Sequence, residues 1–178
     1  MKLIVTKTNL KENLKIIEGA IKDDANLTIL KNALIDATED EIKIKATNLE
    51  LAITSILSGK IIEKGKTTFL FSVLSDIVNN LQLERLNINL VDSKLEIITD
   101  NYTANLNTEP IEDFPIIPEI KNKNNFIEIK GEILKEGLNQ VLSSAQTNEI
   151  RPELNSVLLS FNIDNIKLTT TDGIRLSE

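Results

Sequence analysis

The tripeptide Leu10-Lys11-Glu12 returns as Leu134-Lys135-Glu136, and this repeat decides how the rest of the 178-residue sequence is interpreted. Matching Thr47 with Thr171 sets the offset at 171 − 47 = 124 residues, and the two copies then align without a gap. The matched apolar pairs are Leu3 with Ile127, Val5 with Ile129, Leu14 with Leu138, Ile17 with Val141, Leu30 with Leu154, Leu34 with Leu158 and Ile42 with Ile166. The sequence therefore predicts two copies of one structural unit.

Each copy predicts the same order of elements. An alternating segment indicates a short half-buried strand, with Leu3 and Val5, or Ile127 and Ile129, pointing inward. Apolar residues at helical spacing then predict an amphipathic helix. Its stripe consists of Leu10, Leu14, Ile17 and Ile21 in the first copy, and of Leu134, Leu138, Val141 and Leu142 in the second. A hairpin follows, pairing 33–38 with 42–46, and 157–161 with 166–170.

The residues between the copies complete the first unit with a related half. We expect a strand at 67–71, a helix at 72–83, a hairpin of 86–91 with 94–99, and a strand at 102–107. Pro110, Pro115 and Pro118 mark an extended segment. The fold class is therefore α+β, with helices packed on antiparallel sheets. We expect one domain at 1–122, a polar linker at 123–125, and a second domain at 126–178 that is cut off halfway.

The composition removes several classes of function. The sequence has no His, Cys or Trp, so the commonest general base, the thiol nucleophile and thiolate metal ligands are missing. No glycine-rich phosphate loop can be written around Gly59 or Gly65. The acidic clusters Asp23-Asp24 and Glu39-Asp40-Glu41 are candidates for a Mg²⁺ or acid–base site. Solvated turn charges are the favoured interpretation of both, so we expect no enzyme, no metal and no cofactor.

The charge and the N-terminus restrict the partners and the compartment. The net charge of −7 argues against a simple basic nucleic-acid binder, so any DNA contact requires a local basic stripe. Lys11, Lys15 and Lys22 form such a stripe on the polar flank of the first helix. The N-terminus has no signal-peptide layout and no apolar run is long enough to span a bilayer, so we expect a cytoplasmic protein.

Five short segments resemble one known family. They are 28–34 (Thr-Ile-Leu-Lys-Asn-Ala-Leu), 46–51 (Ala-Thr-Asn-Leu-Glu-Leu), 112–115 (Glu-Asp-Phe-Pro), 150–155 (Ile-Arg-Pro-Glu-Leu-Asn) and 171–176 (Thr-Asp-Gly-Ile-Arg-Leu). In this order and with the internal repeat, they resemble the beta subunit of bacterial DNA polymerase III, the sliding clamp. The resemblance covers the whole chain. It implies the N-terminal part of a protein whose three similar domains per subunit form a two-subunit ring around DNA.

The resemblance also implies which residues face DNA. Helices line the central hole in this family, so Lys11, Lys15 and Lys22 are expected to face phosphates, with Lys135 at the equivalent place in the second copy. Such contacts are independent of base sequence and weaken with salt. Asp24 stands where the family often has a basic DNA-contacting residue, which counts against contact by that loop. Asn148 takes the place of a polar DNA-contacting residue.

Two further sites follow from the resemblance. The strand near Tyr102, Ala104 and Leu106 is expected at a sheet edge that pairs with the second subunit of a homodimer. A hydrophobic pocket is expected to receive short peptide motifs of the polymerase catalytic subunit, the clamp loader and other clamp-binding proteins. Its residues in this sequence are Leu154, Thr171, Gly173, Ile174, Arg175 and Leu176. Ile174 replaces a common His there. Without the family, the Thr171-Asp172-Gly173 segment is simply a tight turn.

Three functions remain open on the sequence. The first is a DNA-encircling processivity factor that acts by topology. The second is a peptide-binding adaptor or degenerate clamp fragment with the same fold that does not encircle DNA. The third is a carboxylate-dependent hydrolase using Glu39, Asp40 or Asp113, which requires these carboxylates to converge in a cleft.

Overall fold

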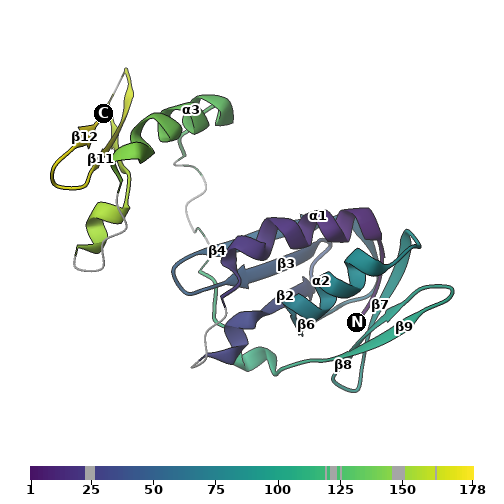
Figure 1. Cartoon of the computed structure of the whole chain (residues 1–178). Helices are drawn as coiled ribbons and strands as arrows, with labels where there is room; N and C mark the ends of the chain where they lie inside the picture. The colour runs from purple at the N-terminus through teal and green to yellow at the C-terminus, as the bar shows by residue number, and fades with distance from the viewer. Residues whose placement is uncertain (23–26, 119, 121–123, 125, 146–150, 163) are drawn as a thin grey trace. The chain divides into compact units, whose positions relative to one another are not determined.

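The computed structural model describes all of the chain except residues 23–26, 119, 121–123, 125, 146–150 and 163. The chain divides into two compact units, Met1–Glu119 and Ile120–Glu178 (Figure 1). The described part of the chain contains no helix long and apolar enough to cross a membrane.

The first unit places two helices on two antiparallel sheets (Figure 1). The strands are β1 (Lys2–Thr6), β2 (Asn32–Ala37), β3 (Ile42–Thr47), β4 (Ala52–Leu57), β5 (Gly59–Glu63), β6 (Gly65–Leu70), β7 (Arg85–Val91), β8 (Lys94–Ile98) and β9 (Thr103–Asn107). The helices are α1 (Lys7–Ile17) and α2 (Phe71–Asn80), with the short 3-10 turns η1 (Glu18–Ala20), η2 (Thr28–Lys31) and η3 (Ile111–Asp113). One sheet has the order β4-β3-β2-β6, and the other has the order β5-β1-β7-β8-β9.

The sequence of helix α1 determines where the helix begins and which of its faces is buried. The hydroxyl of Thr6 accepts a hydrogen bond from the backbone N–H of Asn9 and so caps the N-terminus. Leu10, Leu14 and Ile17 lie on one face and are buried against the sheets. Burying each of these side chains stabilises the fold by about 1.5–3 kcal/mol. The polar face of the helix is thereby directed to solvent.

Strands β4 and β5 were not predicted from the sequence, and they join the two sheets. Only Ser58 separates them, so the chain passes directly from the edge of one sheet to the edge of the other. Gly59 makes this corner possible. A Cβ there would lie 2.7 Å from Val5 Cγ1 and 2.8 Å from the carbonyl oxygen of Ile4. The backbone can approach this closely only where the side chain is absent.

The second unit repeats the first at the offset of 124 residues. Its elements are α3 (Gly131–Val141), η4 (Leu142–Ser144), η5 (Pro152–Asn155), β10 (Leu158–Phe161), β11 (Ile166–Thr171) and β12 (Leu176–Ser177). Subtracting 124 from the bounds of α3, η4, η5 and β11 returns the bounds of α1, η1, η2 and β3. The hairpin register is also kept, since Leu158 pairs with Thr169 as Leu34 pairs with Lys45. The predicted repeat is confirmed.

Two details of the second copy were predicted wrongly. Residues 126–130 form no strand, and Ile127 is 58% exposed instead of facing inward. In the first copy, β1 is held between β5 and β7, and no strand in the described part of the second unit pairs with 126–130 in this way. Leu142 lies in η4 after the helix has ended, where the tighter turn leaves it half-exposed instead of in the apolar stripe.

Among the elements predicted for the first unit, the largest difference lies at the two ends of α2. Phe71 begins α2 instead of ending the preceding strand, and α2 ends at Asn80, short of the expected residue 83. The predicted hairpin around Asp92-Ser93 is confirmed, with both residues at positive φ (45° and 63°) as a tight two-residue turn requires.

Candidate nucleic-acid interface and peptide pocket

Two of the candidate lysines project from the solvent side of α1. Lys11 and Lys15 are exposed, and they stand opposite the buried stripe of the helix. Lys22 is also exposed, but it follows η1, where its backbone N–H donates to the carbonyl oxygen of Leu30 at 3.2 Å. Lys7, at the start of α1, is used differently, because its Nζ donates to the carbonyl oxygen of Leu81 at 2.5 Å. Lys11 and Lys15 are therefore the cations of α1 that are directed to solvent.

The other candidate DNA contacts are less concentrated. Lys135 is exposed on α3, at the position equivalent to Lys11, but Glu132 and Glu136 lie on the same helix. Asp24 and Asn148 lie outside the described residues.

A network of hydrogen bonds organises the turn that carries most of the candidate peptide-pocket residues. The hydroxyl of Thr171 accepts from the N–H of Gly173 at 3.0 Å and donates to the carbonyl oxygen of Arg175 at 2.7 Å. Oδ1 of Asp172 accepts from the N–H groups of Ile174 and Arg175, at 2.9 and 2.6 Å. Gly173 supplies the positive φ of 90° that the turn requires.

The same network explains the acidity of Asp172. The backbone N–H of Arg175, then that of Ile174, and then the Arg175 side chain stabilise the carboxylate and lower the pKa of Asp172 to about 2. Nε of Arg175 reaches Oδ2 of Asp172 at 3.0 Å. Arg175 is thereby fixed beside the turn.

The structure brings only two of the six pocket candidates together. Leu154 of η5 and Thr171 of β11 line a cavity of about 340 Å³. The remaining lining residues are Glu153, Ser156, Val157, Leu158, Thr169 and Thr170. Gly173, Ile174, Arg175 and Leu176 do not line it, and Ile174 is 95% exposed at the tip of the turn. The sequence prediction missed Val157 and Thr169, although Thr169 lies two residues before Thr171 on β11 and so shares its side of the strand.

Strand β9 is at the edge of the five-stranded sheet. Leu106 is buried and Ala104 is partly buried in the core, so these side chains point inward and the exposed feature of this edge is its backbone. Tyr102 precedes the strand, and its carbonyl oxygen accepts from the N–H of Thr99 at 2.8 Å. The tyrosine side chain itself is exposed.

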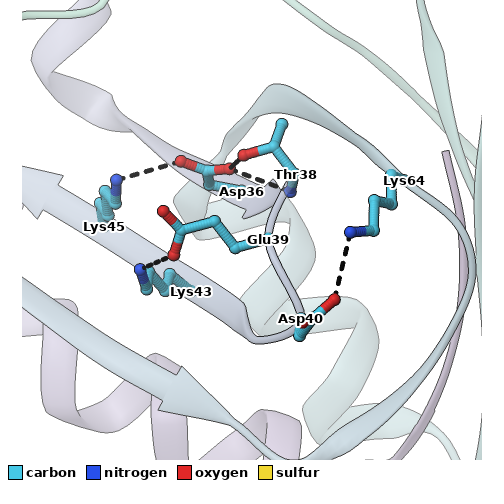
Figure 2. A network of polar contacts seen from close by, with 7 residues as sticks. All are labelled: Asp36, Thr38, Glu39, Asp40, Lys43, Lys45 and Lys64. Atoms are coloured by element: carbon cyan, nitrogen blue, oxygen red, sulfur yellow. Dashed lines mark hydrogen bonds and ion pairs between the residues drawn. The ribbon is translucent and has the colours of Figure 1, made fainter.

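Three carboxylates in or beside the β2–β3 turn, Asp36, Glu39 and Asp40, are paired with lysines (Figure 2). Lys45 reaches Asp36 at 3.1 Å, Lys64 reaches Asp40 at 3.1 Å, and Lys43 bonds Glu39. Partial burial acts to raise the pKa of Asp36, but hydrogen bonds from Thr38 and Lys45 outweigh it and hold the pKa below its usual value.

These pairings also count against the hydrolase interpretation. Among the described residues, no group of three or more acidic side chains could hold a metal ion. Asp113 lies in η3, outside the β2–β3 turn that carries Glu39 and Asp40. The carboxylates on which a hydrolase would depend are thus engaged in ion pairs or scattered over separate turns.

Residues 1–118 match the family described as DNA polymerase III beta subunit, N-terminal domain. The chain belongs to this family. It is 30% identical over 179 aligned residues to the beta sliding clamp of Buchnera aphidicola subsp. Acyrthosiphon pisum, covering 99% of this chain and 48% of that protein. The family membership confirms the resemblance on which the sequence analysis relied.

Solved structures give the same assignment and confirm the α+β clamp fold. A putative DNA polymerase III beta subunit from Eubacterium rectale superposes with a TM-score of 0.93 at 29% identity, covering 99% of this chain and 48% of that one. A sliding clamp from Bartonella birtlesii, solved bound to griselimycin, has a TM-score of 0.87 at 27% identity, with 99% and 48% coverage. This member of the beta-subunit family thus spans about half the length of the relatives it matches.

Proposed function

We propose that this chain forms the N-terminal part of a sliding clamp, a processivity factor that encircles duplex DNA and tethers the replicative polymerase without catalysing a reaction. Residues 1–122 form clamp domain one, 123–125 the linker, and 126–178 the first half of clamp domain two. The protein acts in the cytoplasm, where a bacterial chromosome is replicated.

The observation that carries this proposal is the repeat of one helix-on-sheet unit. In the first unit, α1 covers β3 and β4 and presents Lys11 and Lys15 to solvent. In the second unit, α3 covers β11 and presents Lys135 in the same register. Flexible lysines contact phosphates without reading bases, so they hold DNA and let it slide. The same chemistry does not favour an adaptor that binds only peptides.

The partners follow from the two remaining surfaces. The backbone edge of β9, beside Tyr102, Ala104 and Leu106, pairs with the second subunit and closes a homodimeric ring. The cavity of Leu154 and Thr171, with the turn through Leu176, receives apolar motifs of the polymerase catalytic subunit, the clamp loader and related proteins. Burial of one or two apolar anchors, at about 25 cal/mol per Å², supplies most of the affinity in such a pocket.

A chimera tests encirclement. Residues 1–178 replace the matching half of the Buchnera aphidicola sliding clamp, and retention on circular DNA is measured before and after the circle is cut. We expect retention on the circle and loss on cutting, because a topological link needs a closed substrate. A folded, dimeric chimera that is never retained on the circle contradicts the proposal, and retention that survives cutting indicates ordinary DNA binding.

The pocket is tested separately in the same chimera. Leu154→Ala is expected to weaken a clamp-binding peptide at least tenfold in a calorimetric titration, because it removes an apolar wall. Retention on circular DNA should not change. Leu159→Ala, at an apolar position of β10 that lies outside the cavity lining, is the control. Equal peptide affinity in both variants shows that the pocket lies elsewhere.

A further inference from the structure

Asp172-Gly173 is the only place in the sequence where glycine directly follows an aspartate or an asparagine. Glycine has no Cβ, so its backbone nitrogen is unshielded and can approach the side chain of the residue before it. In a chain without fixed structure, this nitrogen attacks the carboxyl carbon and closes a five-membered succinimide ring. Asp172-Gly173 is therefore the point at which the backbone is most open to rearrangement, and the surrounding turn controls whether the reaction takes place.

The rearrangement releases one water molecule and takes one up. The Gly173 nitrogen forms a bond to Cγ of Asp172, and its proton leaves with the hydroxyl of the neutral carboxyl group as water. Water then opens the ring at one of its two carbonyl carbons. Opening at Cγ restores aspartate, whereas opening at the main-chain carbonyl carbon makes the chain run through the side chain as isoaspartate.

The turn engages the attacking nitrogen. The N–H of Gly173 donates to the hydroxyl of Thr171 at 3.0 Å. The same hydroxyl donates to the carbonyl oxygen of Arg175 at 2.7 Å, which fixes the position of its oxygen. The Gly173 proton is therefore already used in the turn, and the nitrogen can attack only after this hydrogen bond breaks.

The turn also protects the carboxyl group that would be attacked. Oδ1 of Asp172 accepts from the N–H groups of Ile174 and Arg175, and Oδ2 accepts from Nε of Arg175. These bonds hold the side chain in one position, and it is only 8% exposed. They also lower the pKa of Asp172 from 3.8 to about 2, which makes the reactive neutral form roughly 50- to 100-fold rarer at neutral pH.

The corresponding turn of the first unit lacks this reactive pair. Asn48 accepts two backbone N–H groups there as Asp172 does, and the hydroxyl of Thr47 accepts from the next residue but one. That residue is Leu49, whose branched side chain shields its nitrogen. Only the turn of the second unit thus combines the protecting hydrogen bonds with a sequence that reacts when they open.

We propose that Asp172-Gly173 is a latent isoaspartate site, which the hydrogen bonds from Thr171 and Arg175 keep unreacted while the turn is closed. Isoaspartate adds one methylene group to the main chain, so the turn cannot close again with the same hydrogen bonds. The damage would begin beside the cavity that Leu154 and Thr171 line. This inference depends on the chemistry of the turn and not on the proposed function.

The rate of isoaspartate formation tests the inference. The 178-residue chain and a synthetic peptide of residues 168–178 are warmed together at neutral pH for several weeks. Enzymatic methylation measures isoaspartate, and fragmentation mass spectrometry assigns it to Asp172. We expect the peptide to accumulate isoaspartate and the folded chain to do so at least about tenfold more slowly, because it reacts only through open states of the turn.

Two variants identify the protecting groups. Thr171→Val removes both hydroxyl hydrogen bonds and should accelerate the reaction about three- to tenfold. Arg175→Gln leaves the backbone hydrogen bonds in place, so it should keep a native amide spectrum and accelerate the reaction by a smaller factor. Thr47→Val makes the same change in the first turn and is the matched control, with no change expected at Asp172.

Three results would overturn the inference. A peptide that forms no isoaspartate means that the pair is not reactive. A folded chain that reacts as fast as the peptide means that the turn does not protect it. Parent rates in both Thr171→Val and Arg175→Gln mean that other contacts protect it, and Arg175→Gln alone decides this point if Thr171→Val unfolds the second unit.

Discussion

The turn at Thr47–Leu51 and the turn at Thr171–Arg175 have the same backbone hydrogen bonds but share only their threonine. In both turns the threonine hydroxyl accepts from the residue two places on, at 3.0 Å, and donates to the carbonyl oxygen four places on. In both, the next side chain accepts two backbone N–H groups through Oδ1. The geometry is a property of the repeated hairpin, and more than one set of residues satisfies it.

The two turns differ in backbone strain at the residue with positive φ and in the charge of the side chain that accepts the backbone N–H groups. The position with positive φ is Leu49 (74°) in the first turn and Gly173 (90°) in the second, so the first turn forces a branched side chain into a left-handed conformation. The acceptor is neutral Asn48 in the first turn and charged Asp172 in the second, where Arg175 also reaches it. The candidate pocket turn is thus the less strained and the more charged of the two.

The largest expected effect is a loss of stability in the first unit when Gly59 is replaced at the corner between β4 and β5. Gly59→Ala inserts a Cβ within 3.0 Å of side-chain methyl groups of Val5 and Ile42 and of the Ile4 carbonyl oxygen, which is backbone and cannot move without shifting β1. We expect the free energy of unfolding of the first unit to fall by about 3 kcal/mol or more. Chemical denaturation followed through β1 and β4 amide signals measures it. Gly131→Ala, where a Cβ meets nothing within 4 Å, is the control.

The next effect concerns a polar contact that the second copy has replaced. Ser55 on β4 donates to Asn13 Oδ1 at 2.5 Å, and both side chains are buried. Ser55→Ala leaves the Asn13 oxygen unpaired, so we expect a loss of about 1–3 kcal/mol in urea denaturation. The 124-residue offset places Gly137 opposite Asn13, and α3 therefore has no such dependence. Restored stability in Asn13→Leu with Ser55→Ala would support this reason, whereas no loss in Ser55→Ala alone would contradict it.

A buried polar residue also explains why strand β4 could not be predicted from the sequence. The repeat predicted α1 and both hairpins because their apolar residues keep one period, but β4 buries Ser55 and exposes Ile56, which hides its alternation. Gly59 and Gly65, considered from the sequence only as phosphate-loop candidates, each begin a strand where the chain passes between sheets. Pattern alone also favoured a strand at 126–130, since it carries no information about available partners.

The candidate sites were predictable to different degrees. Lys11 and Lys15 could be assigned to a solvent face because helical spacing fixes it locally. Ser75 and Asn79 of α2 line one groove with these lysines, but the sequence could not place them there, because α1 and α2 meet only in the folded unit. Similarly, the sequence grouped Leu154 with the whole 171–176 turn, but only Thr171 of that turn lines the cavity. Proximity along the chain is a weak guide to which side chains share a surface.

Exchanging the residues at positive φ sharpens the comparison of the turns. Gly173→Leu makes the second turn resemble the first, and we expect a loss of about 1–2 kcal/mol from the left-handed conformation. Leu49→Gly is expected to gain only a few tenths of a kcal/mol, because glycine also has more freedom to lose on folding. Thermal unfolding of both variants, with Glu50→Gln as a neutral control in the same turn, measures the difference. A destabilised Leu49→Gly would mean that the leucine side chain has a contact that outweighs its backbone strain.

The smallest effect is a difference in acid sensitivity. The pKa of Asp172 is lowered to about 2 by the N–H groups of Arg175 and Ile174 and by the Arg175 side chain, whereas Asn48 does not titrate. A carboxyl whose pKa is lower when folded contributes stability above its unfolded value, and this contribution is lost as the pH falls through about 2. The amide signals of Ile174 and Arg175 should therefore shift with a midpoint near pH 2, while the Leu51 amide shows no step there. Asp172→Asn converts the second turn to the chemistry of the first, so it should abolish the step and keep both backbone hydrogen bonds. A step that persists in Asp172→Asn would assign the titration to another group, and a midpoint near 4 would mean that the turn opens in solution.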